Sequence, residues 1–363
     1  MVKIGSSLKI NVTELKVFIR KVLISHGVGH NQADIAADII VTADLRGIPS
    51  HGCLRMLPFY IPLLRSGVVN MEAAPTITQE SGRITYIKGN RSLGFSTSHQ
   101  AMNKSIEKAR TLGMGATFVS DSTHFGIASY YSMMAAKNNF IGITITNGSP
   151  AVVAPGGKSP LLGTNALSIA FPRYKELPLV TDISLSTTSL GNLFLAIQEG
   201  REVPYYLGAD SLLFNHNMEG AQTIDPKLIY DSRMTTPLGA GDKKAEYKGL
   251  QLGLLIDLFI TLFFGGDFSF EQQKGQANHL FIALMPHLLI NNDKYNNAFK
   301  RLEEYFDNYE ILEGYENIRI PGQRSNELEK IRRKEGIPLD EPLHNCLIEI
   351  SKRSKVEFKQ LFN

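Results

Sequence analysis

Four short runs rich in β-branched residues constrain most strongly what this chain can fold into. They occupy residues 115–122, 140–149, 165–172 and 177–184, and glycine, asparagine or proline borders each run. Runs of this composition and length are typical of strands. A helical pattern at 127–139 separates the first two runs, so the sequence predicts a mixed sheet with helices at the centre of the chain.

Both ends of the chain carry helical patterns instead. Apolar residues recur at helical spacing from Val12 to Leu23, and Gly27 ends this run. Asn31 is predicted to cap a second helix that ends at Gly47, and a helix disturbed by two prolines is predicted over 50–64. The tail has three more charged, amphipathic segments, at 294–306, 326–335 and 341–360.

Helical ends of this kind are expected to pack together around an inserted sheet. We predict a helical domain made of residues 1–75 with 290–363, and a central sheet domain, 76–289, that carries the cofactor and substrate sites. The most apolar stretch runs from Leu250 to Gly266. It is short for a membrane span and contains Asp257, so it is predicted to be a buried helix.

The composition limits the partners of this protein. Its 363 residues include 38 Lys and Arg against 35 Asp and Glu, and the basic residues are scattered, so no nucleic-acid-binding stripe is indicated. Cys53 and Cys346 lie far apart without a Cys-x-x-Cys motif, which indicates a reducing, cytoplasmic setting. Charges interrupt the N-terminal residues, unlike a signal peptide. We expect neither nucleic acid nor a membrane as partner.

Two of the nine histidines stand in unusual surroundings. His51 lies in Pro-Ser-His-Gly and His124 in Ser-Thr-His-Phe-Gly, and each is expected at the start of a helix, where the dipole favours a neutral imidazole. A structural role is the alternative for each. Arg55, four residues after His51, would share a helix face with it and bind a carboxylate, or else form a surface salt bridge.

A glycine- and proline-rich segment, 147–165, follows a predicted strand and is long enough to bind a phosphate or cofactor through backbone N–H groups. The chain has no G-x-G-x-x-G or Walker motif, so a dinucleotide would not bind in the Rossmann manner. A serine hydrolase is disfavoured, because adjacent Ser50 and His51 generally cannot face each other. No H-x-x-H or H-E-x-x-H spacing supports a metal site.

Together these segments resemble the malate/L-lactate dehydrogenase family of the non-Rossmann type. That family also includes sulfolactate, ureidoglycolate and diketogulonate oxidoreductases. The resemblance extends over nearly the whole chain and rests on seven blocks in order. The blocks are ADLRGIPSHGCLR (43–55), STHFGIASYYSMMA (122–135), IGITITNGSPAVVAPGGKSPLLGTN (141–165), LVTDIS (179–184), EYKG (246–249), NHLFIAL (278–284) and IPGQRSNE (320–327).

The resemblance implies that the protein moves a hydride between NAD or NADP and a small 2-hydroxy or 2-oxo acid. Malate and oxaloacetate are the first expectation. It also implies an α+β fold, in which a large, mostly antiparallel mixed sheet is flanked by helices and by a helical domain built from both termini. The fold is not a Rossmann fold, the expected assembly is a homodimer, and no metal is needed.

Matching motif positions also imply roles for individual residues. His51, His124 and Asp182 are expected to be catalytic, Asp182 by orienting a histidine, while Ser50 and Arg55 are expected to bind the substrate. The resemblance leaves open which histidine carries the proton. The expected cofactor contacts are Asn147, Leu179, Val180, Thr181, Asp182, Ile183, Ser184, Tyr247, Lys248, Gly322, Gln323 and Arg324.

The chain departs from the family's motifs, mainly on the cofactor side. A proline of the family is Ala166 here, a lysine is Asn192, a glycine is Gln251 and a glutamate is Gln323, while residues 200–245 fit poorly. These departures leave the choice between NAD and NADP open. They also motivate a second hypothesis, in which the protein has lost catalysis and serves as a metabolite-binding dimer.

Overall fold

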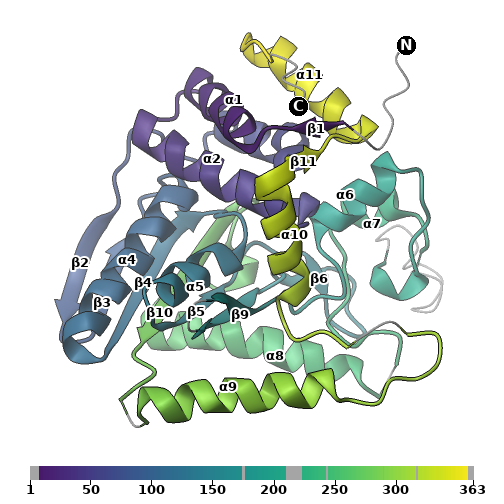
Figure 1. Cartoon of the computed structure of the whole chain (residues 1–363). Coiled ribbons are helices and arrows are strands. Elements are labelled where there is room, and N and C mark those ends of the chain that lie inside the picture. The colour runs from purple at the N-terminus through teal and green to yellow at the C-terminus, as the bar shows by residue number, and fades with distance from the viewer. Residues whose placement is uncertain are drawn as a thin grey trace.

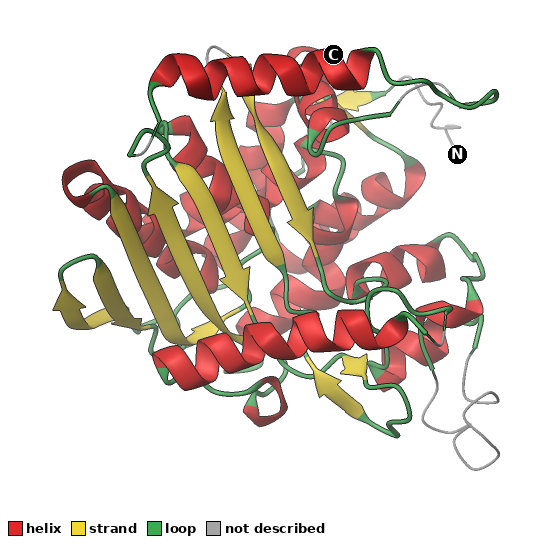
Figure 2. Ribbon diagram, turned by 90° about the horizontal axis from the view of Figure 1, so that it is seen from below, coloured by secondary structure: helices red, strands yellow, loops and turns green. Residues whose placement is uncertain are grey.

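The computed structural model describes residues 8–173, 176–209, 223–242, 244–288, 290–315 and 318–358. At its centre lies a seven-stranded sheet with the order β2-β3-β4-β10-β5-β8-β9, shown in Figure 2. Neighbouring strands are antiparallel, except that β3 and β4 are parallel. The strands are β2 (Thr76–Ser81), β3 (Ile84–Lys88), β4 (Met114–Thr123), β5 (Ile141–Thr146), β8 (Leu167–Arg173), β9 (Glu176–Ile183) and β10 (Gln276–Leu284).

Four of these strands, β4, β5, β8 and β9, coincide with the β-branched runs of the sequence. In β5 and β8 buried residues alternate with half-buried ones, as in strands that are covered on both faces. The strand β10 comes from much later in the chain, yet it lies between β4 and β5 and pairs with both. The predicted fold class, a mostly antiparallel mixed sheet with helices and no Rossmann topology, is confirmed.

One face of the sheet is covered by α4 (Gly94–Leu112) and α5 (Ala128–Lys137), as Figure 1 shows. Glycines let these helices approach the strands closely. A Cβ at Gly115 of β4 would lie 2.1 Å from the Ser105 carbonyl oxygen, and a Cβ at Gly142 of β5 would lie 2.1 Å from that of Ser132. Side chains at these two positions would therefore push the helical layer away from the sheet.

On the opposite face, α8 (Glu246–Leu258) and α9 (Asn292–Asp307) run across the two ends of the strands, as Figure 2 shows, and α9 has no buried residue. A π-helical turn, η7 (Phe259–Phe263), continues α8. Ile256 and Ile260 pack against buried apolar residues of β4 and β10. This second apolar layer completes the core around the sheet.

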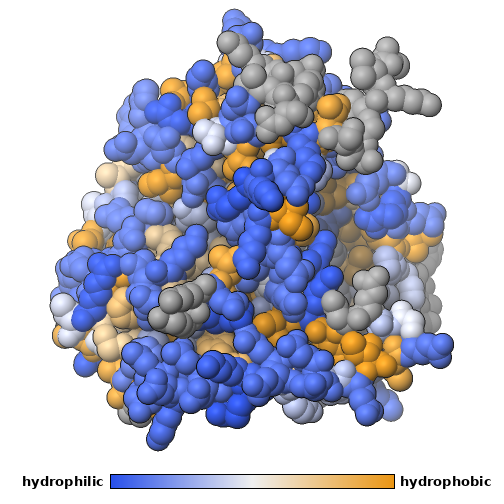
Figure 3. All heavy atoms as spheres, viewed as in Figure 1, coloured by the Kyte–Doolittle hydropathy of each residue, from blue (hydrophilic) through white to orange (hydrophobic). Residues whose placement is uncertain are grey.

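The apolar stretch around α8 was predicted to be a buried helix, and this is only partly correct. Asp257 is fully buried on the sheet side, but Leu262 and Phe263 of η7 are 73% and 65% exposed. Figure 3 shows hydrophobic residues gathered on the surface over α8. None of the described helices is long and apolar enough to cross a membrane.

The helices of the two chain ends pack against one another (Figure 1). Lys9 and Ile10 form β1 and pair with Pro338 and Ile337 of β11, which ties the ends together. The division into domains at residues 75 and 290 stays a prediction. The elements of the two ends are β1 (Lys9–Ile10), α1 (Val12–Ser25), α2 (His30–Leu45), α10 (Gln323–Glu335), β11 (Ile337–Pro338) and α11 (Glu341–Ser354).

The predicted cap at Asn31 is wrong, because α2 already begins at His30 and Gly29 occupies the N-cap position. Glycine is acceptable at this position, so the helix does not need the asparagine side chain there.

The other connecting elements lie near the sheet edge and the long loop after β5. They are β6 (Val152–Val153), β7 (Pro160–Leu162), α6 (Leu190–Gln198), η4 (Tyr205–Leu207), α7 (Pro226–Ser232) and η8 (Ser269–Glu271).

Candidate active site

The turn formed by Ser50, His51 and Gly52 is built against a buried carboxylate. Asp44, near the end of α2, accepts a hydrogen bond from the Cys53 N–H at 2.8 Å. A Cβ at Gly52 would lie 1.8 Å from the Asp44 Oδ1, so only glycine fits at this position. The Tyr60 hydroxyl donates a further hydrogen bond to the His51 carbonyl oxygen at 3.1 Å. These contacts fix the backbone that carries His51.

His51 and Arg55 do not share a helix face, contrary to the prediction. They belong to separate 3₁₀ turns, η1 (Pro49–His51) and η2 (Cys53–Arg55). The break falls at Gly52, whose backbone is extended. The chain then continues through the π-helical turn η3 (Met56–Tyr60) into α3 (Ile61–Arg65). Local contacts with Asp44 therefore replace the helical continuity expected from the spacing.

His124 follows directly after β4, while α5 begins only at Ala128, so neither histidine lies at the start of a helix as predicted. Burial is what keeps both imidazoles neutral. It lowers the pKa of His51 to about 4, with a further contribution from Arg55, and it lowers the pKa of His124 well below the ordinary value. The two rings lie nearly parallel, with centroids 5.8 Å apart. The structure thus brings two neutral imidazoles together.

The two histidines have different hydrogen-bond partners. Nδ1 of His124 accepts a hydrogen bond from the Gly126 N–H at 3.2 Å, which places the proton of the neutral ring on Nε2. Ser50 and His51 do face each other, contrary to the prediction: Nδ1 of His51 lies 3.0 Å from the Ser50 hydroxyl, which can either donate or accept. Only His51 can therefore keep its partner in both protonation states.

Two buried arginines near these histidines also differ in their partners. Arg46, 2% exposed, donates to Glu329 at 2.8 Å and to Asn326 at 3.0 Å. Arg55, 7% exposed, forms no salt bridge within the described residues, and its Nη1 is buried without a hydrogen-bond partner. Its guanidinium lies 4.7 Å from the ring centroid of Phe59. Because an unpaired buried cation is costly, this arrangement favours binding of an anion at Arg55.

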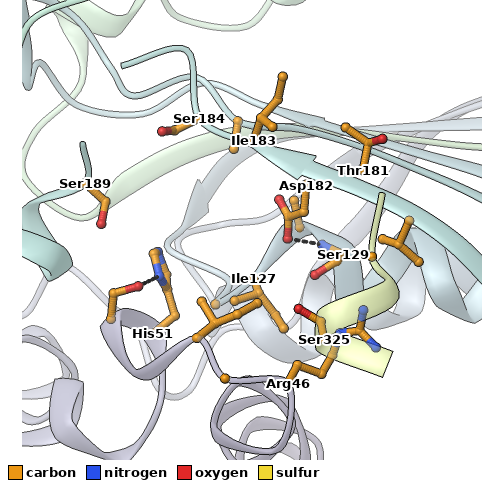
Figure 4. A pocket seen from close by; sticks show the side chains of 18 of the residues that line it. Arg46, His51, Ile127, Ser129, Thr181, Asp182, Ile183, Ser184, Ser189 and Ser325 are labelled. Carbon is orange, nitrogen blue, oxygen red and sulfur yellow. Dashed lines mark hydrogen bonds between the residues drawn. The ribbon is translucent and has the colours of Figure 1, made fainter. Parts of the chain in front are cut away.

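His51 lies between two cavities. The smaller cavity, of about 130 Å³, is lined by both histidines and Arg55. The larger cavity, of about 590 Å³, follows β9 and the start of α10 (Figure 4). A molecule in one cavity would therefore meet a molecule in the other beside His51. The residues that line both cavities are His51, Phe125, Gly126, Thr164, Ala166 and Ser189.

Most of the large cavity's predicted residues come from β9 and the residue after it. They are Val180, Thr181, Asp182, Ile183 and Ser184, and Figure 4 shows the last four. Asp182 accepts a hydrogen bond from the Ser129 N–H of α5 at 2.9 Å, and burial raises the pKa of its carboxyl. In the described part of the chain, no hydrogen bond joins Asp182 to His51 or His124.

The first turn of α10 lines the large cavity as well, through Arg324 and Ser325. Gly322 occupies the N-cap position with a left-handed φ of 83°, and a Cβ there would lie 2.8 Å from the Val180 carbonyl oxygen. No side chain caps this helix. A free helix N-terminus beside an arginine is suited to a phosphate group.

The other predicted cofactor contacts do not line the large cavity. Asn147 lines the small cavity, but its amide donates to the buried Asp257 at 2.9 Å and accepts from Gln272 at 2.8 Å. This network explains why Asp257 can be buried within the apolar stretch from Leu250 to Gly266. Of the positions that depart from the family's motifs, Ala166 and Asn192 line the large cavity. The predicted cofactor residues outside both cavities are Leu179, Tyr247, Lys248 and Gln323.

Sequence reasoning missed several residues of the site. Arg233 lines the small cavity, and the hydroxyls of Thr187, Thr188 and Ser189 line the large one. Arg233 was missed because it lies in residues 200–245, the segment that fits the family's motifs poorly. A third buried histidine, His279, has a structural role, because Thr146 Oγ1 and the Thr123 carbonyl oxygen satisfy its ring nitrogens at 2.8 and 3.1 Å.

The chain is similar to known proteins over nearly its whole length. The family described as malate/L-lactate dehydrogenase matches residues 10–348. The malate/(S)-sulfolactate dehydrogenase of Methanothermus fervidus is 34% identical over 96% of this chain and 98% of its own length. The (2R)-3-sulfolactate dehydrogenase (NADP(+)) of Chromohalobacter salexigens is 30% identical over 87% of this chain and 89% of its own.

Solved structures of this family are similar as well. The crystal structure of malate dehydrogenase from Entamoeba histolytica matches with a TM-score of 0.88 at 28% identity, covering 96% of this chain and 99% of that one. The chain therefore belongs to the malate/L-lactate dehydrogenase family and is an oxidoreductase of that family.

Proposed function

We propose that this protein transfers a hydride between NAD or NADP and a small 2-hydroxy or 2-oxo acid, with malate and oxaloacetate as the first choice. One observation carries the proposal. His51, His124 and the unpaired Arg55 line a cavity of about 130 Å³ that shares a wall with a cavity of about 590 Å³. The first suits a small acid, and the second lies within the usual range of about 300–1,000 Å³ for cofactor sites.

The large cavity fits a nicotinamide dinucleotide in its chemistry as well as its size. Backbone and hydroxyl groups from β9 and from residues 187–189 line it, and Arg324 at the start of α10 suits a phosphate. When bound, the nicotinamide supplies or accepts the hydride at C2 of the acid. A relative named as NADP-dependent supports a nicotinamide cofactor here, with NAD and NADP as the two candidates.

In this proposal Arg55 holds the substrate carboxylate and His51 moves the proton. The guanidinium binds both carboxylate oxygens with parallel hydrogen bonds. During oxidation neutral His51 accepts the proton of the hydroxyl group, and during reduction its imidazolium returns a proton to the carbonyl oxygen. The negative charge of the bound acid opposes the effect of Arg55 on His51, so it favours the imidazolium that reduction requires.

The choice of His51 over His124 rests on their partners. The Ser50 hydroxyl can accept a hydrogen bond from Nδ1 of a His51 imidazolium, so proton uptake costs no contact. The Gly126 N–H can only donate, so a protonated His124 would lose its partner. Neutral His124 instead donates from Nε2 to the substrate oxygen and stabilises negative charge that develops there.

We also propose a homodimer in the cytoplasm. Leu255, Leu262 and Phe263 are exposed on α8 and η7, and a concentrated apolar surface of this kind usually contacts a partner. Cys53 and Cys346 are free thiols, in keeping with a reducing compartment. Sedimentation of the double variant Leu262→Asp, Phe263→Asp tests the dimer: we expect a monomer, and an unchanged dimer would contradict this interface.

The oxidation of NADH and NADPH, followed by absorbance, tests the activity with oxaloacetate, pyruvate and 3-sulfopyruvate. We expect turnover with at least one nucleotide and one oxo acid, and dehydrogenation of the matching hydroxy acid. Absence of turnover with every pair, together with absence of NADH or NADPH binding by fluorescence, would contradict the proposal. Binding of a hydroxy acid under those conditions would instead favour the metabolite-binding dimer.

A further inference from the structure

The small cavity contains more positive charge than one carboxylate requires. Arg55 and Arg233 both line it, and the described residues around it include no aspartate or glutamate. Burial lowers the pKa of Arg233, and the nearby charge of Arg55 lowers it further. Lys274, next to the lining residue Gly275, has a pKa lowered by burial, Arg233 and Arg55. Three cations therefore surround one small space.

Arg233 is oriented without being neutralised. Its Nε donates to the Pro150 carbonyl oxygen and its Nη2 to the Ser149 hydroxyl, each at 3.0 Å. Both acceptors are uncharged and belong to the loop after β5, which also lines the cavity. Arg233 ends α7 with a left-handed φ of 55°, a conformation that costs energy for a residue with a side chain. Such strain is often retained where a side chain has a function.

Arg55 is equally without an anion among the described residues: it forms no salt bridge there, its Nη1 has no hydrogen-bond partner, and the side chain that it does contact, Tyr230, carries a hydroxyl. One carboxylate between the two arginines would pair with one of them and leave the other uncompensated. A ligand with two anionic groups would pair with both. The total charge of the cavity therefore matches a dianion better than a monoanion.

We propose that Arg233 is a specificity residue, which binds the distal anionic group of a dianionic 2-oxo or 2-hydroxy acid while Arg55 binds the carboxylate next to the reacting carbon. This rests on the proposed function of the same site. The distal group is a carboxylate, as in oxaloacetate, or a sulfonate, as in 3-sulfopyruvate. Lys274 adds positive charge at the rim. Acids without the distal group are poor substrates, because they leave Arg233 unpaired.

Steady-state kinetics of the full-length protein test this with four oxo acids. Oxaloacetate and 3-sulfopyruvate carry the distal anion, 2-oxosuccinamate replaces it with a neutral amide of the same shape, and pyruvate lacks it. We expect kcat/KM of the wild type to be about 100-fold higher for the better dianion than for 2-oxosuccinamate. The preferred dianion identifies the distal group as carboxylate or sulfonate. Equal values for dianions and amide would overturn the proposal.

Two variants assign the preference to Arg233. Arg233→Gln should lower kcat/KM for the preferred dianion about 100-fold and change that for 2-oxosuccinamate less than about 3-fold. Arg233→Gly should behave in the same way, and glycine tolerates the left-handed backbone, so this variant keeps the fold. Equal losses on both substrates would overturn the proposal. Arg201→Gln is the matched control, since Arg201 is exposed and paired with Glu199.

Binding measurements separate failure of this inference from failure of the proposed function. If the wild type turns over none of the acids, the proposed function fails, and calorimetry still compares L- and D-malate with their 4-amides. Tighter binding of a malate that Arg233→Gln abolishes supports the dianion site without catalysis. Equal binding of malates and amides, or absence of binding by all, overturns it.

Discussion

The two cavities that meet at His51 are lined by different chemistry. The small cavity has two histidines and two arginines whose charges are not compensated within the described residues. The large cavity has backbone and hydroxyl groups, and its buried arginine, Arg46, is paired with Glu329 at 2.8 Å. Buried cations without an anionic partner are thus found in the small cavity, where a small acid would supply the missing charge, whereas Arg324 of the large cavity is exposed to solvent. The larger cavity can bind a ligand mainly through hydrogen bonds and close packing.

The largest effect is expected from removing the proton carrier of the small cavity. His51→Gln should lower kcat about 1,000-fold, and His124→Gln about 100-fold, because in the proposed mechanism the first transfers the proton and the second only stabilises charge. The affinity for NADH should change less than about 3-fold, since His124 lies outside the large cavity and His51 is one of many residues that line it. Stopped-flow kinetics and NADH fluorescence measure the two quantities.

The control for these variants is His30→Gln, on the exposed start of α2, which should leave kcat unchanged. A larger loss for His124→Gln than for His51→Gln would reverse the two assigned roles. A loss of NADH affinity equal to the loss of kcat would remove the distinction between the cavities.

Replacing each buried arginine by glutamine sharpens the comparison between paired and unpaired charge. Arg55→Gln should lower kcat/KM about 100-fold and leave the free energy of unfolding unchanged or raised by about 1 kcal/mol, because it removes an uncompensated buried cation. Arg46→Gln should lower the free energy of unfolding by about 2 kcal/mol, because it removes the buried partner of Glu329, which keeps only its ion pair with the exposed Arg333. Urea unfolding measures both. Destabilisation by Arg55→Gln as large as that by Arg46→Gln would contradict the assignment.

The pH dependence of oxidation tests the electrostatics of the small cavity. In the proposed mechanism oxidation requires neutral His51, and burial with Arg55 lowers the pKa of His51 to about 4 in the free protein. The value of kcat/KM for the hydroxy acid should therefore stay constant as pH falls from about 8 to about 5, and decrease tenfold per unit below about 4. An ordinary histidine would cause the decrease from about pH 6.5. Arg55→Gln should move the decrease to higher pH, because Arg55 contributes to the low pKa.

The smallest effect is expected in the large cavity, where many weak contacts share the binding. Arg324→Gln should weaken NADH or NADPH binding about 5-fold and less so at high salt, because a helix N-terminus and a screened cation each contribute about 1 kcal/mol. The KM for the oxo acid should not change. Arg301→Gln, on the exposed face of α9, is the control. If Arg324→Gln changed the KM for the oxo acid and left nucleotide binding unchanged, the phosphate would have to bind at another position.

Local signals in the sequence were sufficient for the strands and for the histidine motifs. The β-branched runs of β4, β5, β8 and β9 favour extended backbone whose side chains are mostly buried or half-buried, and this is a local property of each strand. His51 and His124 were recognisable by their turns. The physical reason given for their neutrality was wrong, because burial by distant segments, rather than a helix N-terminus, lowers their pKa values.

The parts of the site that could not be predicted depend on contacts between distant segments. Gly52 is required because Asp44 occupies the space of its side chain, and the sequence does not show that approach. Arg233 reaches the small cavity only because Ser149 and Pro150 hold it there. Arg46 is neutralised by Glu329, which lies 283 residues away along the chain. The charge balance of each cavity is thus a property of the assembled fold.

The short ladder between β1 and β11 has a consequence for synthesis of the protein. Lys9 and Ile10 pair with residues 338 and 337, so the N-terminal segment waits for nearly the whole chain to leave the ribosome. The turn that carries His51 belongs to the first part of the chain and Arg324 to the last. A growing chain can form β2-β3-β4 and β5-β8-β9 early, but the two halves of the sheet are joined only when β10 emerges, and the proposed nucleotide site is complete only when α10 does.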